Sequence, residues 1–347
     1  MIRITELKLP LAALPIEQRR ASDAPAETTA DRDLPPHPIA ALQALAAQML
    51  GVAETVIAEL KVFKRSFDAR KADLRVVYIV DLRLHDEALE TEVLRRLHKH
   101  PHVSASPDMV WRPPPRPKAA ASPDSLRPVV VGFGPCGMFA ALVLAQMGFK
   151  PLVIERGQSV RQRTKDTWDL WRRSHLHSES NVQFGEGGAG TFSDGKLYSQ
   201  IKDPRHLGRK VMEELVRFGA PEDILFAAHP HVGTFKLVKV VEGLREEILR
   251  LGGEIWFQHR VCDLRRDAQG RVEALQVEAL EHGELRWVES RQVVLALGHS
   301  ARDTFTMLHR HGVRMQAKPF SIGVRIEHPQ SLIDRARWGR HAGHPLL

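Results

Sequence analysis

Three glycines and a later acidic residue have the types and the spacing to bind a dinucleotide. Gly132, Gly134 and Gly137 form a Gly-x-Gly-x-x-Gly pattern, and Glu155 follows Gly137 by 18 residues. Glycines at such positions let the chain turn tightly and let a pyrophosphate approach the backbone, while a carboxylate about 20 residues later can accept hydrogen bonds from ribose hydroxyls. The alternative is a glycine-rich turn in an ordinary α/β domain.

The flanking sequence predicts the elements that this chemistry requires. Residues 129–131 are three consecutive valines, which predict a short buried parallel strand. A helix is expected over 135–148, with Pro135 near its start, and residues 151–154 predict a second strand that delivers Glu155. Strand, glycine turn, helix and strand together favour the dinucleotide site over the plain turn.

A second glycine-rich stretch, residues 185–196, repeats the glycine spacing in a different context. Only a weak strand precedes it and no apolar helix follows it, so we do not expect a second nucleotide-binding fold. Its glycines instead allow backbone N–H groups to face an anion or a flat ring closely. A buried strand over 292–297 ends at Gly298, where a new helix begins near His299, and this arrangement brings further backbone to the carboxyl edge of the sheet.

Several side chains have both a chemical and a structural interpretation. Cys136 lies inside the first glycine loop, where a redox role and small-residue packing are both open and packing is favoured. His299 could act as an acid or base because the usual pKa of histidine lies near neutrality, although helix-cap packing is favoured. Trp168 and Trp171 are interpreted as core anchors rather than as part of a cofactor site. We recognise no nucleophile–base set and no metal-ligand spacing, so hydrolase and metal-centre interpretations have little support.

Length and composition describe a globular chain. Its 347 residues are 43% hydrophobic and 27% charged, and this length predicts about two domains. Two cysteines without metal or redox spacing favour a reducing cytoplasm. The net charge is +8, but basic and acidic residues are interleaved, so we expect neither nucleic acid nor membrane as a partner. The longest apolar stretch, 138–147, is too short to cross a bilayer.

Proline-rich residues 106–127 divide the chain into two parts. Residues 1–105 show patterns in the order strand, helix, strand, strand, helix, which predicts a small α+β domain of the ferredoxin-like type. An Ala/Pro-rich insertion at 10–38 is expected to be a loop. Residues 128–347 then form a Rossmann-like domain, and the expected fold class is α/β.

Five stretches of the sequence are similar to those of one protein family. They are VVVGFGPCGMFAAL, LVIERG, NVQFGEGGAGTFSDGKL, VVLALGHSARDT and, near the amino terminus, VFKRSFDARK. Together they resemble a bacterial family of FAD-dependent dehydrogenases within the two-dinucleotide-binding-domain flavoproteins. The resemblance implies an FAD-dependent oxidoreductase that passes a hydride or electrons through bound flavin, with NAD(P)H as a candidate electron donor. It does not identify the small-molecule substrate or the oligomeric state.

The resemblance also implies which residues contact FAD. The first glycine loop would hold the pyrophosphate, Glu155 the ribose and the strand at Val261 the adenine, while the second glycine loop would pass near the isoalloxazine. Lys196 would place a positive charge near the flavin N1, with a surface lysine as the alternative. The residues so assigned are Gly132, Gly134, Pro135, Cys136, Gly137, Glu155, Arg156, Gly187, Gly188, Gly190, Ser193, Lys196, Val261 and Gly298.

The chain departs from this family in one respect. Such flavoproteins carry a late Gly-Asp pair whose carboxylate holds the ribityl chain, and this sequence contains no Gly-Asp dipeptide. We therefore expect either a chain truncated at its carboxyl end or a carboxy-terminal FAD segment that is supplied elsewhere. A non-catalytic protein that binds FAD, or only its ADP half, is the alternative to the enzyme.

Overall fold

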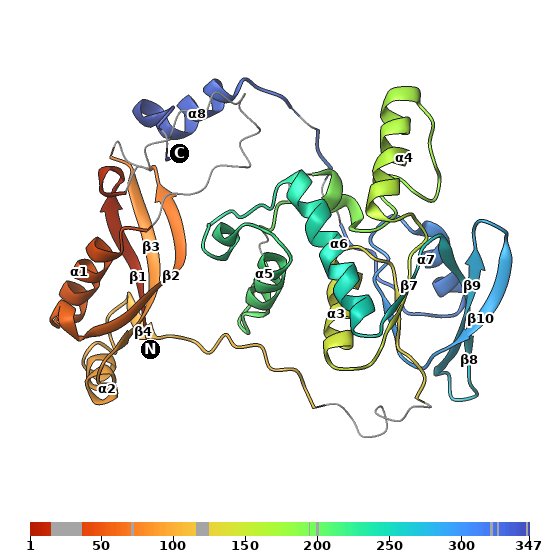
Figure 1. The fold of residues 1–347 in the computed structure, drawn as a ribbon, viewed down its shortest axis with the longest axis horizontal. Helices are drawn as coiled ribbons and strands as arrows, with labels where there is room; N and C mark the ends of the chain where they lie inside the picture. The colour runs from red at the N-terminus through yellow and green to blue at the C-terminus, as the bar shows by residue number, and fades with distance from the viewer. Residues whose placement is uncertain are drawn as a thin grey trace.

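The computed structural model describes residues 1–14, 37–70, 73–115, 125–193, 195–198, 201–319, 322–324, 326–344 and 346–347. Most of the insertion expected at 10–38 and the middle of the proline-rich linker lie outside these ranges. Figure 1 shows a small sheet near the amino terminus and a larger α/β body, joined by the linker. The residues of the linker that are described, 106–115 and 125–127, contain neither helix nor strand.

The amino-terminal part is an antiparallel sheet with two helices. Its elements are β1 (Ile2–Pro10), α1 (Ile39–Leu50), β2 (Ile57–Asp68), β3 (Arg75–Leu84), α2 (Glu87–Arg96) and β4 (Val103–Ala105). The sheet order is β2-β3-β1-β4. Every helix and strand expected here is present, and β4 is added. Helix α2 begins where Asp86 accepts a hydrogen bond from the Ala88 N–H at 2.8 Å, which satisfies one of the unpaired amides of the first turn.

The core of this part forms because β1 and β3 alternate in side-chain direction. Ile2, Ile4, Tyr78 and Val80 are completely buried, and they pack with α1 on one face of the sheet. Helix α8 (Gln330–Trp338), far along the chain, lies near this sheet (Figure 1), and its Trp338 packs against the same core. The sequence pattern contained no signal for this contact.

The larger part contains the predicted parallel sheet. Its strands are β5 (Val129–Val131), β6 (Leu152–Ile154), β7 (Glu254–Trp256) and β11 (Val293–Leu295), in the order β11-β5-β6-β7. In register, Val129 lies opposite both Leu152 and Val293. Both the α/β class and the parallel sheet are thus present.

The two faces of the parallel sheet are covered by different elements. One face packs on α3 (Pro135–Gln146) and α6 (Thr234–Arg250) through residues such as Val130 and Val153. The other packs through Val129 and Ile154. The elements on that second side are β8 (His259–Arg266), β9 (Val272–Ala279), β10 (Glu284–Glu289) and α7 (Arg302–Arg310). Successive side chains of a strand point to opposite faces of the sheet. Because these short strands are apolar throughout, they present apolar side chains to the elements that cover each face.

Three elements differ from the sequence-based prediction. The sequence of residues 254–261 predicts one strand, but the structure splits this segment into β7 and β8 because Gln258 has a φ of 57°, which breaks an extended strand. The helix expected from His299 begins only at Arg302. The sequence of residues 320–327 also predicts a strand, but the residues of this segment that are described, 322–324 and 326–327, are not in a strand.

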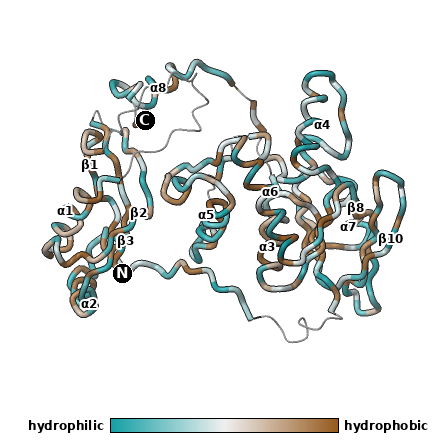
Figure 2. Tube along the Cα trace, in the orientation of Figure 1, coloured by the Kyte–Doolittle hydropathy of each residue, from teal (hydrophilic) through white to brown (hydrophobic). Residues whose placement is uncertain are grey.

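The prediction that Trp168 and Trp171 are core anchors is wrong. Both lie on α4 (Val160–Arg173), and their exposed fractions are 46% and 56%. The buried residues of α4 are Val160, Arg163 and Thr167, which share one helical face. Figure 2 shows that α4 is largely hydrophilic along its length.

The remaining described helices are α5 (Leu207–Arg217) and short 3-10 turns. These turns are η1 (Leu11–Ala13), η3 (Glu54–Val56), η5 (Gly188–Phe192), η6 (Glu222–Leu225) and η7 (Gly339–His341). After η6 the larger part touches the amino-terminal sheet, where the Arg65 N–H donates to the Phe226 carbonyl at 2.7 Å. Within the described residues, no helix combines the length and apolar character that a bilayer crossing would need.

Candidate functional site

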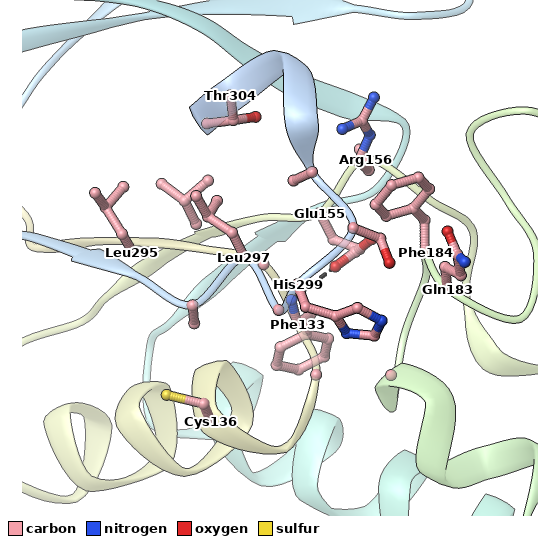
Figure 3. A pocket seen from close by; sticks show the side chains of 18 of the residues that line it. Phe133, Cys136, Glu155, Arg156, Gln183, Phe184, Leu295, Leu297, His299 and Thr304 are labelled. Atoms are coloured by element: carbon pink, nitrogen blue, oxygen red, sulfur yellow. Dashed lines mark hydrogen bonds between the residues drawn. The ribbon is translucent and has the colours of Figure 1, made fainter. Parts of the chain in front are cut away.

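A cavity of about 740 Å³ opens at the carboxyl edge of β5, β6 and β11 (Figure 3). Backbone and side chains from both glycine-rich stretches and from the segment after β11 line it. The sequence-predicted residues in the lining are Gly132, Gly134, Pro135, Cys136, Glu155, Arg156, Gly188, Val261, Gly298 and His299. The predicted residues outside the lining are Gly137, Gly187, Gly190, Ser193 and Lys196.

The first glycine loop leaves no room for a side chain at two of its glycines. Gly132 has a φ of +97°, and a Cβ atom there would lie 2.5 Å from the Ala296 carbonyl oxygen. A Cβ atom on Gly137 would lie 1.9 Å from the Gly132 oxygen. Gly134 is the N-cap residue of α3, so the first amides of this helix, which lack partners within the helix, lie at the cavity. This arrangement favours an anion.

Glu155 ties the glycine loop to the end of β6. Its side chain is 4% exposed; one carboxylate oxygen accepts from the Phe133 N–H at 2.7 Å and the other from the Gly157 N–H at 2.8 Å. Each carboxylate oxygen has a second lone pair. The side chain therefore braces the loop and keeps acceptor capacity on the cavity side (Figure 3).

Two arginines mark the polar end of the cavity. Arg156 donates to both carboxylate oxygens of Asp303, at 2.9 and 3.0 Å, and to Glu179 at 2.6 Å. Its guanidinium lies 4.3 Å from the centre of the Phe184 ring. Arg260 also donates to Glu179, at 3.1 Å. Burial acts to lower the pKa of Arg156, but the hydrogen bonds to Glu179 and Asp303 outweigh it and the pKa is raised.

Part of the cavity lining is apolar. The side chains there come from β11, the segment after it and α7. They belong to Leu295, Leu297, Phe305, Leu308 and Met315. A cavity lined by both charged and apolar side chains suits a ligand that has a polar and a flat, less polar half.

Arg163, which the sequence analysis did not identify, organises the second glycine loop. Its side chain is fully buried. The guanidinium donates to the carbonyl oxygens of Asn181, Glu186 and Gly188 at 2.7 Å and to that of Val182 at 2.8 Å. Burial lowers its pKa to about 10, so it stays charged at neutral pH. The sequence signal that could have identified Arg163 was its helical spacing from Val160, which places both residues on one face of α4.

The glycines of the second loop serve close packing. A Cβ atom on Gly185 would lie 2.4 Å from Arg163 Cδ, and one on Gly188 would lie 3.2 Å from Gly134 Cα. The Gly187 N–H donates to the Phe133 carbonyl at 2.9 Å. The two glycine loops therefore pack backbone against backbone. The Gly187 N–H is thus used within the protein, and the expectation that other amides of this loop face a ligand stays a prediction.

Glu186 is a buried acid within this loop. One of its carboxylate oxygens accepts from the Val160 N–H and from Arg245, both at 2.7 Å. The other oxygen has no hydrogen-bond partner among the described residues. Burial raises the pKa of Glu186 to about 7, although the Val160 N–H and Arg245 act against this shift.

The residues considered for catalysis lie at or beyond the cavity margin. His299 is exposed and lines the cavity (Figure 3), as does Cys136. Lys196 is exposed and forms a β-bridge with His231 outside the lining. Among the described residues no three His, Cys, Asp or Glu side chains are grouped so that they could hold a metal ion.

Comparison with known proteins identifies one family model and one curated relative. Residues 1–83 match the model of a domain of unknown function, DUF8436. An uncharacterized protein from Clostridium beijerinckii is 41% identical over 309 residues, which cover 86% of this chain and 53% of that protein. The chain thus spans about half the length of this relative.

The solved structures that resemble the chain do so at a lower level of identity, as three of them illustrate. Thermovibrio ammonificans THI4 shares 16% identity over 66% of this chain and 70% of its own, with a TM-score of 0.37. The FAD complex of glycerol-3-phosphate dehydrogenase from Bacillus halodurans shares 13% over 55% and 37%, with a TM-score of 0.34. The E. coli quinol fumarate reductase FrdA with a single mutation shares 15% identity over 54% of this chain and 37% of its own, with a TM-score of 0.37. TM-scores this low do not establish a common fold.

Proposed function

We propose that the cavity binds FAD and that the protein is an FAD-dependent oxidoreductase of the dehydrogenase kind. One observation supports this most directly: the amino end of α3, both glycine loops and the Glu155 carboxylate meet at one cavity on the carboxyl edge of a parallel sheet. Open α/β sheets bind their ligands at this edge.

The residues present fit the parts of a dinucleotide. The amides at the start of α3 are suited to a pyrophosphate, and the missing Cβ atoms of Gly132 and Gly137 keep the loop narrow. Glu155 has lone pairs for ribose hydroxyls, and the Arg156 end of the cavity suits an adenosine. FAD would supply the hydride or electron transfer itself, while this chain binds the cofactor, orients it and limits water.

Two side chains are proposed for roles beside the flavin. His299 lies in the cavity lining and is proposed as an acid or base. Lys196 is proposed as a positive charge for the reduced flavin; its exposure and its position beyond the lining mean that the loop must move for this role. NAD(P)H is proposed as the electron donor, and the substrate is a small molecule of unknown identity.

The cofactor in freshly purified protein tests the proposal directly. Its absorbance spectrum identifies bound flavin, and titration calorimetry of the apoprotein with FAD and separately with ADP gives the two affinities. We expect FAD to bind more tightly than ADP and to be bleached by NADH or NADPH under anaerobic conditions. A folded protein that takes up neither FAD nor ADP would remove the proposal.

The second candidate is a non-catalytic protein that holds FAD or only its ADP half. The open apolar end of the cavity favours it, since Leu295 of β11 is 43% exposed where an isoalloxazine would need cover. This candidate predicts that neither nicotinamide nucleotide reduces the bound flavin and, where only the ADP half is held, that ADP and FAD bind with equal affinity. The anaerobic reduction therefore separates the two functions.

Two further assignments are proposed for the whole chain. The amino-terminal part is proposed to be ferredoxin-like, which its β-α-β-β-α-β order and its sheet order β2-β3-β1-β4 support. The protein is proposed to act in the cytoplasm, which the two free thiols of Cys136 and Cys262 support.

A further inference from the structure

A second, smaller cavity of about 290 Å³ lies between the end of β7 and the three-stranded sheet β10-β9-β8. Phe257 and Gln258, which follow β7, form one wall. The sheet and its β9–β10 turn form the other with His259, Ala279, Glu281, His282, Glu284 and Arg286. Of the described residues, only His259 lines both this cavity and the cofactor cavity, so one imidazole is the wall that they share.

The register of the three strands produces this hollow. His259, Ala279 and Glu284 lie opposite one another across β8, β9 and β10, so their side chains project from the same face of the sheet. The middle residue of this row has only a methyl group between two longer side chains, which leaves space above the sheet. Arg286, two residues after Glu284 on β10, projects from the same face.

This face of the sheet is otherwise apolar. Val261 and Val277 form the next row with Arg286 and are buried in the core beneath the parallel sheet. Val288, two residues after Arg286, packs against the same core. Charged side chains are seldom placed on a core-facing row unless they have a partner. The change from apolar to charged residues along this face therefore marks the hollow as a place where charges are used.

Arg286 is held in place but keeps hydrogen-bond donors available. Its Cζ atom lies 3.7 Å from the centre of the Trp256 ring, and one N–H group donates to His259 Nε2 at 3.4 Å. Nε2 can accept because Nδ1 lies 2.7 Å from the Phe257 carbonyl, which only accepts, so Nδ1 carries the proton. Among the described residues no carboxylate is hydrogen-bonded to Arg286, and Glu254 acts on it only electrostatically. Several of its five N–H donors are thus left for a ligand.

The backbone of Gln258, in the opposite wall, is strained. Its φ of 57° lies in the left-handed region that favours glycine. The Gln258 N–H donates to the Gly157 carbonyl at 3.1 Å, and its carbonyl accepts from the Leu280 N–H at 2.9 Å, so this conformation is fixed from both sides. Its side-chain amide has no hydrogen-bond partner among the described residues. Strained residues cluster at ligand sites, and an amide offers both donors and an acceptor.

We propose that this cavity binds a free α-amino acid with an apolar side chain. The planar donors of Arg286 suit the carboxylate of the ligand, and the Glu284 carboxylate accepts from its ammonium group. These two side chains leave one face of β10 about 7 Å apart, so the two charged groups of one small molecule can reach both. Phe257 and the methyl group of Ala279 provide the apolar contact.

The size and the charges of the cavity support this class of ligand. Its volume lies at the lower end of the range for small-molecule sites, which suits a molecule of about ten non-hydrogen atoms or fewer. Glu284 and Arg286 are exposed, so the ligand enters from solvent. A simple anion fits less well, because two carboxylates, those of Glu281 and Glu284, line the same cavity and repel it.

Titration calorimetry and saturation-transfer NMR of the purified chain, with no flavin or nucleotide added, test the proposal with L-leucine and two analogues. Isocaproate lacks the ammonium group, and isoamylamine lacks the carboxylate. We expect L-leucine to bind at one site per chain and each analogue to bind at least about 10-fold more weakly, because each loses hydrogen bonds between charged groups. Absence of L-leucine binding overturns the proposal, whether or not the same protein takes up FAD in a separate titration.

Three variants locate the binding. Arg286→Met removes the partner of the carboxylate, and Ala279→Leu fills the hollow while every charge stays in place; each is expected to weaken L-leucine binding by at least about 10-fold. Glu284→Gln should weaken L-leucine binding but leave the affinity for isocaproate unchanged. Circular dichroism confirms that each variant is folded.

Arg265→Met is the matched control. Arg265 also stacks on a tryptophan of this sheet, with its Cζ atom 5.1 Å from the centre of the Trp287 ring, but it does not line the cavity. This variant should bind L-leucine as the unaltered protein does. Unchanged binding in both Arg286→Met and Ala279→Leu would place L-leucine elsewhere and overturn the proposal. Inorganic phosphate that binds more tightly than L-leucine, and is lost in Arg286→Met, would overturn it in favour of an anion site.

Discussion

Arg163 and Gly185 are packed so closely that a Cβ atom on Gly185 would lie 2.4 Å from Arg163 Cδ. The second glycine loop is therefore wrapped around a buried guanidinium, which takes the place that an apolar side chain would hold in an ordinary helix interface. The loop in turn packs on the first glycine loop, so the geometry of the whole cavity depends on this pair.

Gly185→Ala is expected to lower the free energy of unfolding by about 2–4 kcal/mol, because the methyl group meets Arg163 and the backbone has a φ of +120°. Urea denaturation measures the change. Gly190→Ala is the matched control in the same loop, since nothing lies within 4 Å of its Cβ position. Equal stability of both variants would contradict the packing described above.

Arg163→Met is expected to lower the free energy of unfolding by about 3–5 kcal/mol, because it leaves several buried carbonyl oxygens without donors. Hydrogen exchange should accelerate over residues 181–191, and Arg163→Lys should recover part of the protection. Arg161→Met, on the same helix, removes only the exposed pair with Glu242 and should leave exchange in the loop unchanged. Slow exchange in Arg163→Met would refute the supporting role of the guanidinium.

The raised pKa of Glu186 predicts that the folded protein loses stability as pH rises. Its pKa is about 7 in the folded protein against an ordinary value of 4.5, so between these values the folded state holds more protons than the unfolded state and the free energy of unfolding falls with increasing pH. The slope contributed is at most about 1.4 kcal/mol per pH unit. Urea titrations from pH 5 to 8 should show a shallower decline in Glu186→Gln, and identical slopes would exclude Glu186 as the source.

The lowered pKa of His37 predicts the opposite pH dependence for the contact between the amino-terminal part and the larger part of the chain. Its ring packs edge-to-face on Phe226, with centroids 4.4 Å apart. Burial, followed by the positive charge of Arg65, lowers its pKa to about 4 from 6.5. The unfolded or separated state therefore binds more protons between these values, and the contact strengthens as pH rises from 4 to 6.5.

The His37 prediction is checked by scattering and proteolysis at pH 5 and pH 7.5. The radius of gyration and the cleavage rate of the linker should be larger at pH 5, and His37→Phe should remove this difference because it keeps the ring without the titration. His98→Phe, at an exposed position, serves as the control. A His37→Phe protein that still opens at pH 5 would point to another titrating group.

Glu155→Gln is expected to weaken FAD binding by about 10- to 100-fold, because the amide places an NH2 donor where one of the carboxylate oxygens accepts from the Phe133 or the Gly157 N–H. Calorimetry with FAD measures it, and circular dichroism confirms folding. Glu281→Gln, at an exposed position, should bind as the unaltered protein does. An unchanged affinity for FAD in Glu155→Gln would show that the Glu155 carboxylate does not bind the ribose.

Local sequence was enough to predict the first glycine loop and its flanking elements. Consecutive valines, glycines at fixed spacing and a proline at the start of α3 act within a few residues, so β5, α3, β6 and the position of Glu155 follow from short-range rules. The same holds for α1 and for the Asp86 cap of α2. These features depend on backbone freedom and side-chain shape, which each segment carries with it.

Only the tertiary structure decided which face of α4 is buried. Periodicity shows that Val160, Arg163 and Thr167 share a face, but hydropathy alone favours burial of the tryptophans over the arginine. Arg163 is buried because carbonyl groups 18 to 25 residues later in the chain satisfy its guanidinium, and the tryptophans are then left at the surface. The second glycine loop and the placement of β11 beside β5 depend on such distant partners as well, and a pattern read along the chain does not contain them.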